Sequence, residues 1–189
     1  MSLLPDADTI DAILGTRGKG DALLGWWGSL TRLLQNLDQA DLTDRQRARL
    51  RAAMRLHFIC DDRASVRTPV DCYVLFQDMQ AHAQEHFDVI LLDTRNRVIR
   101  RENLYKGSLN TTLIRVGEVF RSAVALNAAA VIIAHNHPSG DPSPSPEDTA
   151  LTREIIRAGK LLDIEVLDHI VVGLGRYVSL RESGLAFGD

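Results

Sequence analysis

The sequence predicts an α/β fold: a mixed β-sheet flanked by helices and preceded by a small helical N-terminal region. Residues 1–60 carry apolar side chains at helical spacing, whereas residues 66–189 alternate short apolar runs with amphipathic segments. The 189 residues suffice for one well-buried domain and a small appendage. We therefore expect two parts, a helical region over 1–60 and an α/β domain over 66–189.

Glycines at positions 15, 18, 20, 25 and 28 interrupt the helical pattern of the N-terminal region, so several short helices are expected there. A longer helix is expected after Thr43, which is suited to cap it. Its arginines are interpreted as a solvated face, with a phosphate-binding patch as the alternative. The polar segment 60–67 is expected to be a linker.

The first two helices of the α/β domain are predicted from a cap and from an apolar stripe. Thr68 suits the N-cap of a helix with Pro69 at N1 and Asp71 at N3, which we expect to run to about Gln84. Residues 116–127 have the pattern of an amphipathic helix. Its expected core residues are apolar: Val119, Phe120, Val124 and Leu126.

Short apolar runs predict the strands of the sheet. They are 86–93, 97–103, 129–134, 164–173 and 177–180. A third helix is expected between the last two long strands, from about residue 146 to 158, and it is expected to end near Gly159.

Composition restricts the classes of function. The formal net charge of -3 gives no overall basic field that would indicate nucleic acid binding. Cys60 and Cys72 form neither a disulfide framework nor a CxxC pair, which favours a reduced, cytoplasmic setting. No signal peptide and no apolar run of membrane-spanning length is present, so we expect no membrane association. The oligomeric state stays open.

The residues that carry chemistry follow the strand predicted at 129–134. His135 and His137 stand at i and i+2, so an extended backbone directs both imidazoles to one side. A turn-rich loop with prolines and a glycine then leads to Asp148, in the first turn of the next helix. Two histidines and one carboxylate are a common hydrolytic zinc set with a fourth position for water. We therefore predict a site for one Zn²⁺, although other divalent ions would also suit these ligands.

Each part of this pattern also has a purely structural interpretation. Ser145, Pro146 and Asp148 suit the N-cap, N1 and N3 positions of a helix, which would explain them without any ligand. An isolated H-x-H is not specific for metal. The metal-site hypothesis depends on the conjunction of two histidines at the end of a buried strand with an acid that a stiff loop returns to them.

The spacing H-x-H, seven residues, S, two residues, D matches the signature of the JAMM (MPN+) metalloproteases at His135, His137, Ser145 and Asp148. The blocks NAAAVIIAHNHPSGDPSPSPED, VLDHIVVG and YVSL more closely resemble the RadC family. The resemblance covers about residues 66–185. It implies a JAMM/MPN fold, similar to that of cytidine deaminases, and a zinc-dependent peptidase or isopeptidase that acts on an unknown peptide or protein.

The JAMM pattern also contains an upstream glutamate. Glu85 stands just before the apolar run FDVILLD, as in the RadC block, and is chosen over Glu118, which suits the first turn of a helix. The resemblance then implies that Glu85 is the general base toward the zinc-activated water. It also implies that Ser145 donates a hydrogen bond to the oxyanion of the tetrahedral intermediate.

The RadC resemblance offers a second function, that of a DNA repair or recombination accessory protein with a non-catalytic zinc. RadC relatives carry a helix-hairpin-helix-like N-terminal region that binds DNA through a glycine-rich hairpin. The segment 11–35 resembles the first half of that region, but DLTDRQRARLRAAM replaces the hairpin of the second half. We therefore do not predict strong nucleic acid binding. A zinc deaminase is excluded because H-x-E and P-C-x-x-C are missing.

The other histidines are assigned by their neighbours. Adjacent residues of a strand face opposite sides, so at most one of Asp168 and His169 can face the site, as a support for a ligand. His57, His82 and His86 have no partner at metal-ligand spacing and are expected to make surface or local contacts.

Overall fold

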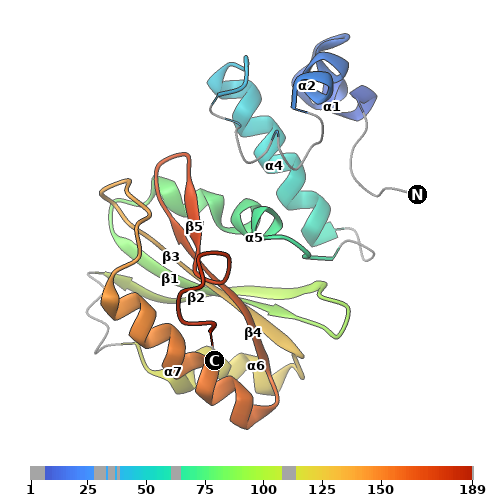
Figure 1. Ribbon diagram of the computed structural model, residues 1–189. Coiled ribbons are helices and arrows are strands. Elements are labelled where there is room, and N and C mark those ends of the chain that lie inside the picture. The colour runs from blue at the N-terminus through green and yellow to red at the C-terminus, as the bar shows by residue number, and fades with distance from the viewer. Residues whose placement is uncertain are drawn as a thin grey trace. The chain divides into compact units, whose positions relative to one another are not determined.

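The computed structural model describes most of the chain (Figure 1). The described residues are 7–27, 33, 37, 39–60, 65–107 and 114–188. The chain divides between residues 64 and 65 into two compact units, and each is described here by itself. None of the helices in the described ranges is both long enough and apolar enough to cross a membrane.

The N-terminal unit contains helices α1 (Ala7–Leu14), α2 (Lys19–Trp27) and α4 (Asp44–Cys60). Of the three residues of α1 with apolar helical spacing, Ile10 and Leu14 are buried and Ile13 is half-buried. The Thr43 hydroxyl accepts a hydrogen bond from the backbone N–H of Gln46 at 3.3 Å, so it caps α4 as expected.

The second unit is built on a five-stranded sheet. Its strands are β1 (Glu85–Leu92), β2 (Val98–Gly107), β3 (Ala130–Asn136), β4 (Glu165–Val172) and β5 (Tyr177–Ser179). The strand order is β2-β1-β3-β4-β5, and only β3 and β4 pair in parallel. The predicted mixed sheet flanked by helices is therefore confirmed. Strand β3 extends two residues beyond the predicted 129–134, so His135 belongs to the strand.

Helices α6 (Val116–Ala125) and α7 (Pro146–Leu162) cover one face of this sheet, and α5 (Pro69–Phe76) covers the other (Figure 1). The core between the sheet and α6 and α7 is apolar. Its fully buried members include Phe87, Val89, Leu91, Val119, Val131, Ile133 and Ile155. Side chains alternate along each strand, so His135 shares the face of Val131 and Ile133 and points toward the α7 layer.

Helix α5 begins as predicted but ends earlier. Thr68 accepts from the backbone N–H of Asp71, and the Asp71 carboxylate accepts from the backbone N–H of Thr68 in return. The expectation of one helix to Gln84 is wrong, because the last turns tighten into a 3₁₀ helix, Gln77–Ala81. A short segment, residues 82–84, connects this 3₁₀ helix to β1.

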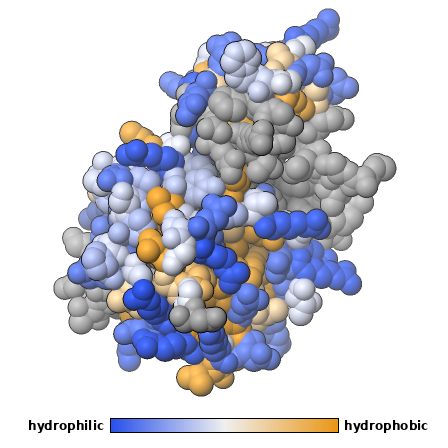
Figure 2. Space-filling view, viewed as in Figure 1, coloured by the Kyte–Doolittle hydropathy of each residue, from blue (hydrophilic) through white to orange (hydrophobic). Residues whose placement is uncertain are grey.

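The predicted core of α6 is partly wrong. Val119 and Phe120 are buried, but Val124 is 55% exposed and Leu126 is 37% exposed. The buried stripe instead continues through Ala123, which lies one turn after Val119 and Phe120. Apolar residues therefore reach the surface of α6. On the face that Figure 2 shows, hydrophobic residues likewise lie among hydrophilic ones.

The expected end of the last helix near Gly159 is also wrong, because α7 continues to Leu162. Gly159 is a packing position: a Cβ atom there would lie 2.5 Å from the backbone oxygen of Ile164. The helix ends at Asp163, which adopts the left-handed conformation with φ 57°.

The close approach at Gly159 leads to a stability prediction. Gly159→Ala is expected to lower the free energy of unfolding by about 1–3 kcal/mol, because the added methyl group forces the backbone of α7 and Ile164 apart. Chemical denaturation measures the change. The matched control is Gly117→Ala in α6, where a Cβ atom meets nothing within 4 Å. That variant is expected to be neutral or to gain up to about 1 kcal/mol, and equal destabilisation of both variants would contradict the packing argument.

Candidate metal centre

His135 lies at the C-terminal end of β3, between two paired strands. It stands opposite Phe87 of β1 and Val171 of β4 in the registers of the sheet. Its side chain is 1% exposed, and the rings of Phe87 and His169 lie beside it, with centroids 6.4 Å and 4.9 Å away. The strand and these rings fix the imidazole in a dry environment.

His137 lies just beyond β3, in a loop that backbone hydrogen bonds fasten to the β4–β5 turn. The backbone N–H of His137 donates to Val172, and that of Leu174 donates to Gly140. Gly140 has φ 82°, a conformation that favours glycine. The Nδ1 of His137 lies 2.8 Å from the backbone oxygen of Asp141, and a carbonyl can only accept, so Nδ1 carries the proton. The Nε2 lone pair of His137 is therefore free to face a cation.

Asp148 stands at the N3 position of α7, as predicted from the cap signature. The Ser145 hydroxyl accepts from the backbone N–H of Asp148, at 3.0 Å. In return, the backbone N–H and the hydroxyl of Ser145 both donate to Asp148 Oδ2, each at 2.7 Å. This capping box occupies Oδ2 and leaves Oδ1 available to a ligand.

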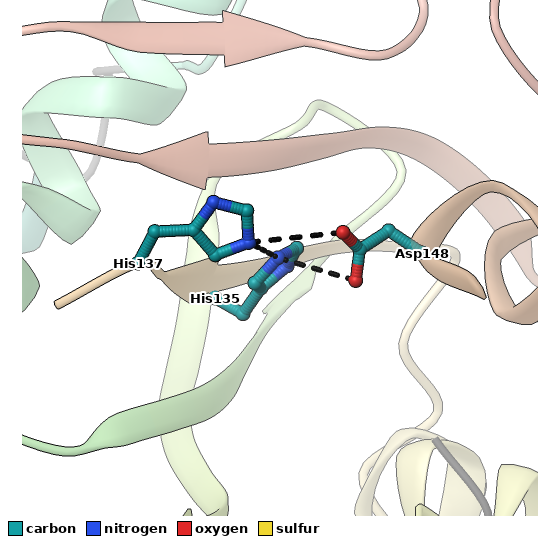
Figure 3. A group of neighbouring side chains, drawn as sticks. All are labelled: His135, His137 and Asp148. Atoms are coloured by element: carbon teal, nitrogen blue, oxygen red, sulfur yellow. Dashed lines mark hydrogen bonds and ion pairs between the residues drawn. The ribbon is translucent and has the colours of Figure 1, made fainter. Parts of the chain in front are cut away.

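The three predicted ligands converge at one point (Figure 3). Nε2 of His135 lies 3.0 Å from Nε2 of His137 and 3.3 Å from Asp148 Oδ1. His137 Nε2 lies 3.7 Å from Asp148 Oδ2. Two ligands of a tetrahedral zinc at bonds of roughly 2.0–2.1 Å stand about 3.3 Å apart. The donor atoms therefore fit a cation of that size, and the residues form a candidate metal-binding group.

Charge couples the three side chains. Although burial raises the pKa of the Asp148 carboxyl, its contacts with His135 and His137 outweigh that effect and hold the pKa far below its usual range. The contact with Asp148 raises the pKa of His137 against partial burial, and the charge of Glu85 contributes in the same direction. A concentration of negative potential thus faces the position that a cation would occupy.

Glu85 is the first residue of β1, so it lies beside the candidate ligands. In the antiparallel register Phe87 pairs with His135, and two further residues along each chain lead to Glu85 and His137. Alternation also places Glu85 on the sheet face of Phe87 and His135. The charge of Glu85 acts on His137, as stated above.

The start of β1 is held by Asn136, which lies between the two histidines in sequence. Its Oδ1 accepts from the backbone N–H of His86 at 2.8 Å, and its Nδ2 donates to the backbone oxygen of Gln84 at 3.1 Å. Asn136 is 1% exposed. It therefore fixes the backbone on both sides of Glu85. Our sequence reasoning missed this residue, because nothing in a single sequence links an asparagine to a segment fifty residues away.

The alternative general base, Glu118, lies in the first turn of α6, as expected. Its side chain is 44% exposed, and its carboxylate forms an ion pair with Arg121 at 3.1 Å. This is an ordinary i,i+3 pair on a helix surface. The position of Glu85 therefore favours it over Glu118.

Of the adjacent pair in β4, His169 faces the candidate ligands and Asp168 faces away. Nε2 of His169 lies 2.8 Å from Nδ1 of His135. The Asp168 carboxylate instead accepts from the Ser179 hydroxyl at 2.6 Å and from the backbone N–H of Arg181 at 3.2 Å, which joins β4 to the segment after it. Burial raises the pKa of this carboxyl.

The remaining histidines make local contacts where the structure describes them. The rings of His82 and His86 stack with centroids 3.9 Å apart, and His86 also contacts Asn103. The side chain of His57 lies outside the described residues, as does that of Cys60. Cys72 is a free, buried thiol.

In the N-terminal unit, the backbone N–H groups at the start of α2 already have an anionic partner. The Asp11 carboxylate accepts from the Thr16 hydroxyl at 2.6 Å and from the backbone N–H groups of Gly18 and Gly20 at 2.5 Å and 2.9 Å. These bonds, led by that of Thr16, lower the pKa of Asp11. A phosphate would have to displace Asp11 from these groups, so this turn gives no support to nucleic acid binding, which was the alternative hypothesis for this region.

Comparison with known proteins gives the chain its relatives. A family model described as "RadC-like JAB domain" matches residues 66–185, which include every candidate site residue. A UPF0758 protein of Roseiflexus castenholzii is 47% identical over 171 residues, covering 86% of this chain and 73% of the relative. A UPF0758 protein of a Roseiflexus species is 54% identical over 129 residues, and one of Bacillus cereus is 44% identical over 135 residues.

The matches to the last two relatives span less than two thirds of those proteins. They cover 68% and 71% of this chain, but 55% and 59% of the relatives. The printed names of the relatives state no activity or substrate. What these longer proteins do as a whole therefore stays a matter for proposal.

The ligand assignment is tested by Asp148→Asn. The loss of the carboxylate charge is expected to weaken Zn²⁺ binding by more than the roughly 10–100-fold typical of residues that only support a ligand. Competition with a chromophoric chelator measures the affinity, and one ion is expected per chain. Asp163→Asn at the other end of α7 is the control, because asparagine tolerates the left-handed conformation there. Equal affinities of the two variants would remove Asp148 from the ligand set.

The capping boxes of α5 and α7 allow the effect of a lost helix cap on stability to be distinguished from its effect on metal binding. Ser145→Ala and Thr68→Ala are each expected to lower the free energy of unfolding by about 1 kcal/mol, because each removes the same N-cap hydrogen bond. Only Ser145→Ala is also expected to weaken Zn²⁺ binding, since Ser145 orients Asp148 through Oδ2. Thermal unfolding and chelator competition measure both effects. If Thr68→Ala weakened zinc binding equally, the effect would be one of general stability.

Proposed function

The chain belongs to the RadC-like JAB domain family, and we propose that it is a zinc-dependent metallohydrolase that cleaves an amide or isopeptide bond in a peptide or protein. The observation that carries the proposal is the convergence of His135, His137 and Asp148 on one point. The nature of the bond is inferred from the JAMM spacing of these residues. A similar site could use the same chemistry on another carbonyl or phosphoryl compound.

The number of ligands supports a catalytic use of the metal. Structural zinc sites are normally closed by four protein ligands, whereas catalytic sites keep a position open. In the described part of the chain, the group at this point contains three ligating residues. His135 and Asp148 are buried, while the side chain of His137 is 19% exposed, so solvent reaches the group from the side of His137.

We assign the proton transfers to Glu85. A zinc ion held by His135, His137 and Asp148 would supply Lewis acidity, which would lower the pKa of a bound water molecule to about 7. The Glu85 carboxylate accepts a proton from the attacking water and returns it to the leaving amine. Its location at the start of β1, on the sheet face of His135, supports this role. Asn136 holds the backbone on either side of it.

The hydroxyl of Ser145 has two roles in this proposal, as a hydrogen-bond donor to Asp148 and as a donor to the substrate. In this structure the hydroxyl proton points to Asp148 Oδ2, at 2.7 Å. To stabilise the oxyanion of the tetrahedral intermediate, as we propose, the hydroxyl turns toward the substrate while the backbone N–H of Ser145 keeps its own bond to Oδ2. The hydrogen bond from the backbone N–H of Ser145 therefore holds Asp148 in place while the hydroxyl rotates.

The general base is tested by Glu85→Gln in zinc-loaded protein. The variant is expected to retain zinc, because Glu85 is not a ligand, and to lose hydrolysis by roughly 10²–10⁴-fold, because glutamine cannot accept the proton. The assays are zinc analysis and cleavage of a library of internally quenched peptides that includes isopeptide-linked members. The control is Glu118→Gln, which removes an exposed surface pair with Arg121.

Two results would overturn the proposal at different points. If Glu85→Gln cleaves as fast as the parent chain, Glu85 is not the base. If the zinc-loaded parent chain cleaves no member of the library, the assignment as a peptidase or isopeptidase fails, whereas the metal site is judged separately by the chelator titration.

A further inference from the structure

A chain of hydrogen bonds leads from one candidate ligand to another through two buried side chains. Nδ1 of His135 lies 2.8 Å from Nε2 of His169, and Nδ1 of His169 lies 2.6 Å from the Thr152 hydroxyl. That hydroxyl lies 2.6 Å from the backbone oxygen of Asp148. His169 and Thr152 are each 0% exposed. The chain therefore starts at one ligand and ends on the backbone of another without reaching solvent.

The last bond of this chain fixes the direction of all the others. A carbonyl oxygen can only accept, so the single proton of the Thr152 hydroxyl is used on Asp148. The hydroxyl must then accept from His169, which places a proton on Nδ1 of His169. The opposite arrangement would bring two lone pairs to within 2.6 Å of each other.

The direction continues to His135 because His169 is neutral. Its ring is fully buried, it contacts a hydroxyl and an imidazole, and the edge of the Phe87 ring lies against it, with centroids 5.8 Å apart. A charged imidazole is disfavoured in such surroundings, and a nearby metal cation would disfavour it further. With its proton on Nδ1, the Nε2 of His169 accepts, and Nδ1 of His135 donates.

We infer that Thr152 and His169 are positioning residues that keep the proton of His135 on Nδ1 and so present its Nε2 lone pair to the metal. The inference rests on the proposed metal site but not on the hydrolytic reaction. His137 is fixed in the same tautomer by the Asp141 carbonyl. Nε2 of both histidines and Oδ1 of Asp148 are then acceptors that converge with no donor among them. Such a set is complementary to a cation and not to a neutral hydrogen-bonding group.

Thr152→Val removes the hydroxyl at nearly constant volume. His169 then either keeps a buried, unpaired Nδ1–H or moves its proton to Nε2. In the second case His135 must accept at Nδ1 and carry its own proton on Nε2, where it blocks the metal. Zinc binding has to reverse this choice, so the affinity for Zn²⁺ is expected to fall by roughly 10–100-fold, as for other residues that orient a metal-ligating histidine. Thr152→Ser keeps the hydroxyl and is expected to restore the affinity.

The experiment uses the full chain with ¹⁵N-labelled histidine. Long-range ¹H–¹⁵N correlation spectra of the zinc-loaded parent chain report which nitrogen of each of the six histidines is protonated. We expect the proton of His169 on Nδ1. Chelator competition then gives the zinc affinities of the parent, Thr152→Val and Thr152→Ser chains, and thermal unfolding shows that the variants are folded.

A proton on Nε2 of His169 in the parent chain would overturn the inference without any variant. So would a folded Thr152→Val chain that binds Zn²⁺ as tightly as the parent, or a Thr152→Ser chain as weak as Thr152→Val. None of these measurements involves cleavage of a substrate. A failure of the proposed hydrolytic function would therefore leave them interpretable, and their failure would leave the peptide cleavage assay interpretable.

Discussion

The double use of the Asp148 carboxylate is the constraint on which the candidate site depends. Oδ2 accepts two hydrogen bonds from Ser145 and so begins α7, while Oδ1 lies 3.3 Å from Nε2 of His135 and Oδ2 lies 3.7 Å from Nε2 of His137. A helix cap and a metal ligand usually have separate side chains. Here the direction of α7, the position of the ligand and the tautomer of His135 are all linked, because the Thr152 hydroxyl returns from the second turn of the same helix to the backbone of Asp148.

Because the Asp148 carboxylate serves both purposes, the capping interpretation and the metal-ligand interpretation of Ser145–Asp148 are compatible. The capping interpretation is correct, and the same capping box presents Asp148 to His135 and His137. The comparison with α5 is instructive, since Thr68, Pro69 and Asp71 build an equivalent box with no histidines nearby in the sequence. A cap signature alone therefore does not identify a ligand, and the histidines at the end of the preceding strand make the difference.

Most of the fold and the convergence of the ligands could be predicted from sequence, because both depend on local periodicity and spacing. The errors arose where tertiary contacts decide. Gly159 suggested a helix end, but it lies inside α7, at a position where the Ile164 carbonyl leaves no room for a side chain. Val124 was predicted to lie in the core, but it is exposed, and the buried face of α6 contains Ala123 instead. Asn136 and Thr152 carried no signal, since their roles exist only when β3, β1 and β4 lie side by side.

The alternation of side chains along β3 has a consequence for how this segment can change. His135 lies on the α7 face, while Asn136 reaches the backbone on both sides of Glu85 from the neighbouring position. Inserting or deleting one residue within Ala130–Ala134 would exchange the two faces for every residue that follows. The position of His135 as a ligand, its contact with His169 and the hydrogen bonds of Asn136 to the start of β1 would then be lost together. We therefore expect β3 to tolerate substitutions but not the insertion or deletion of a single residue.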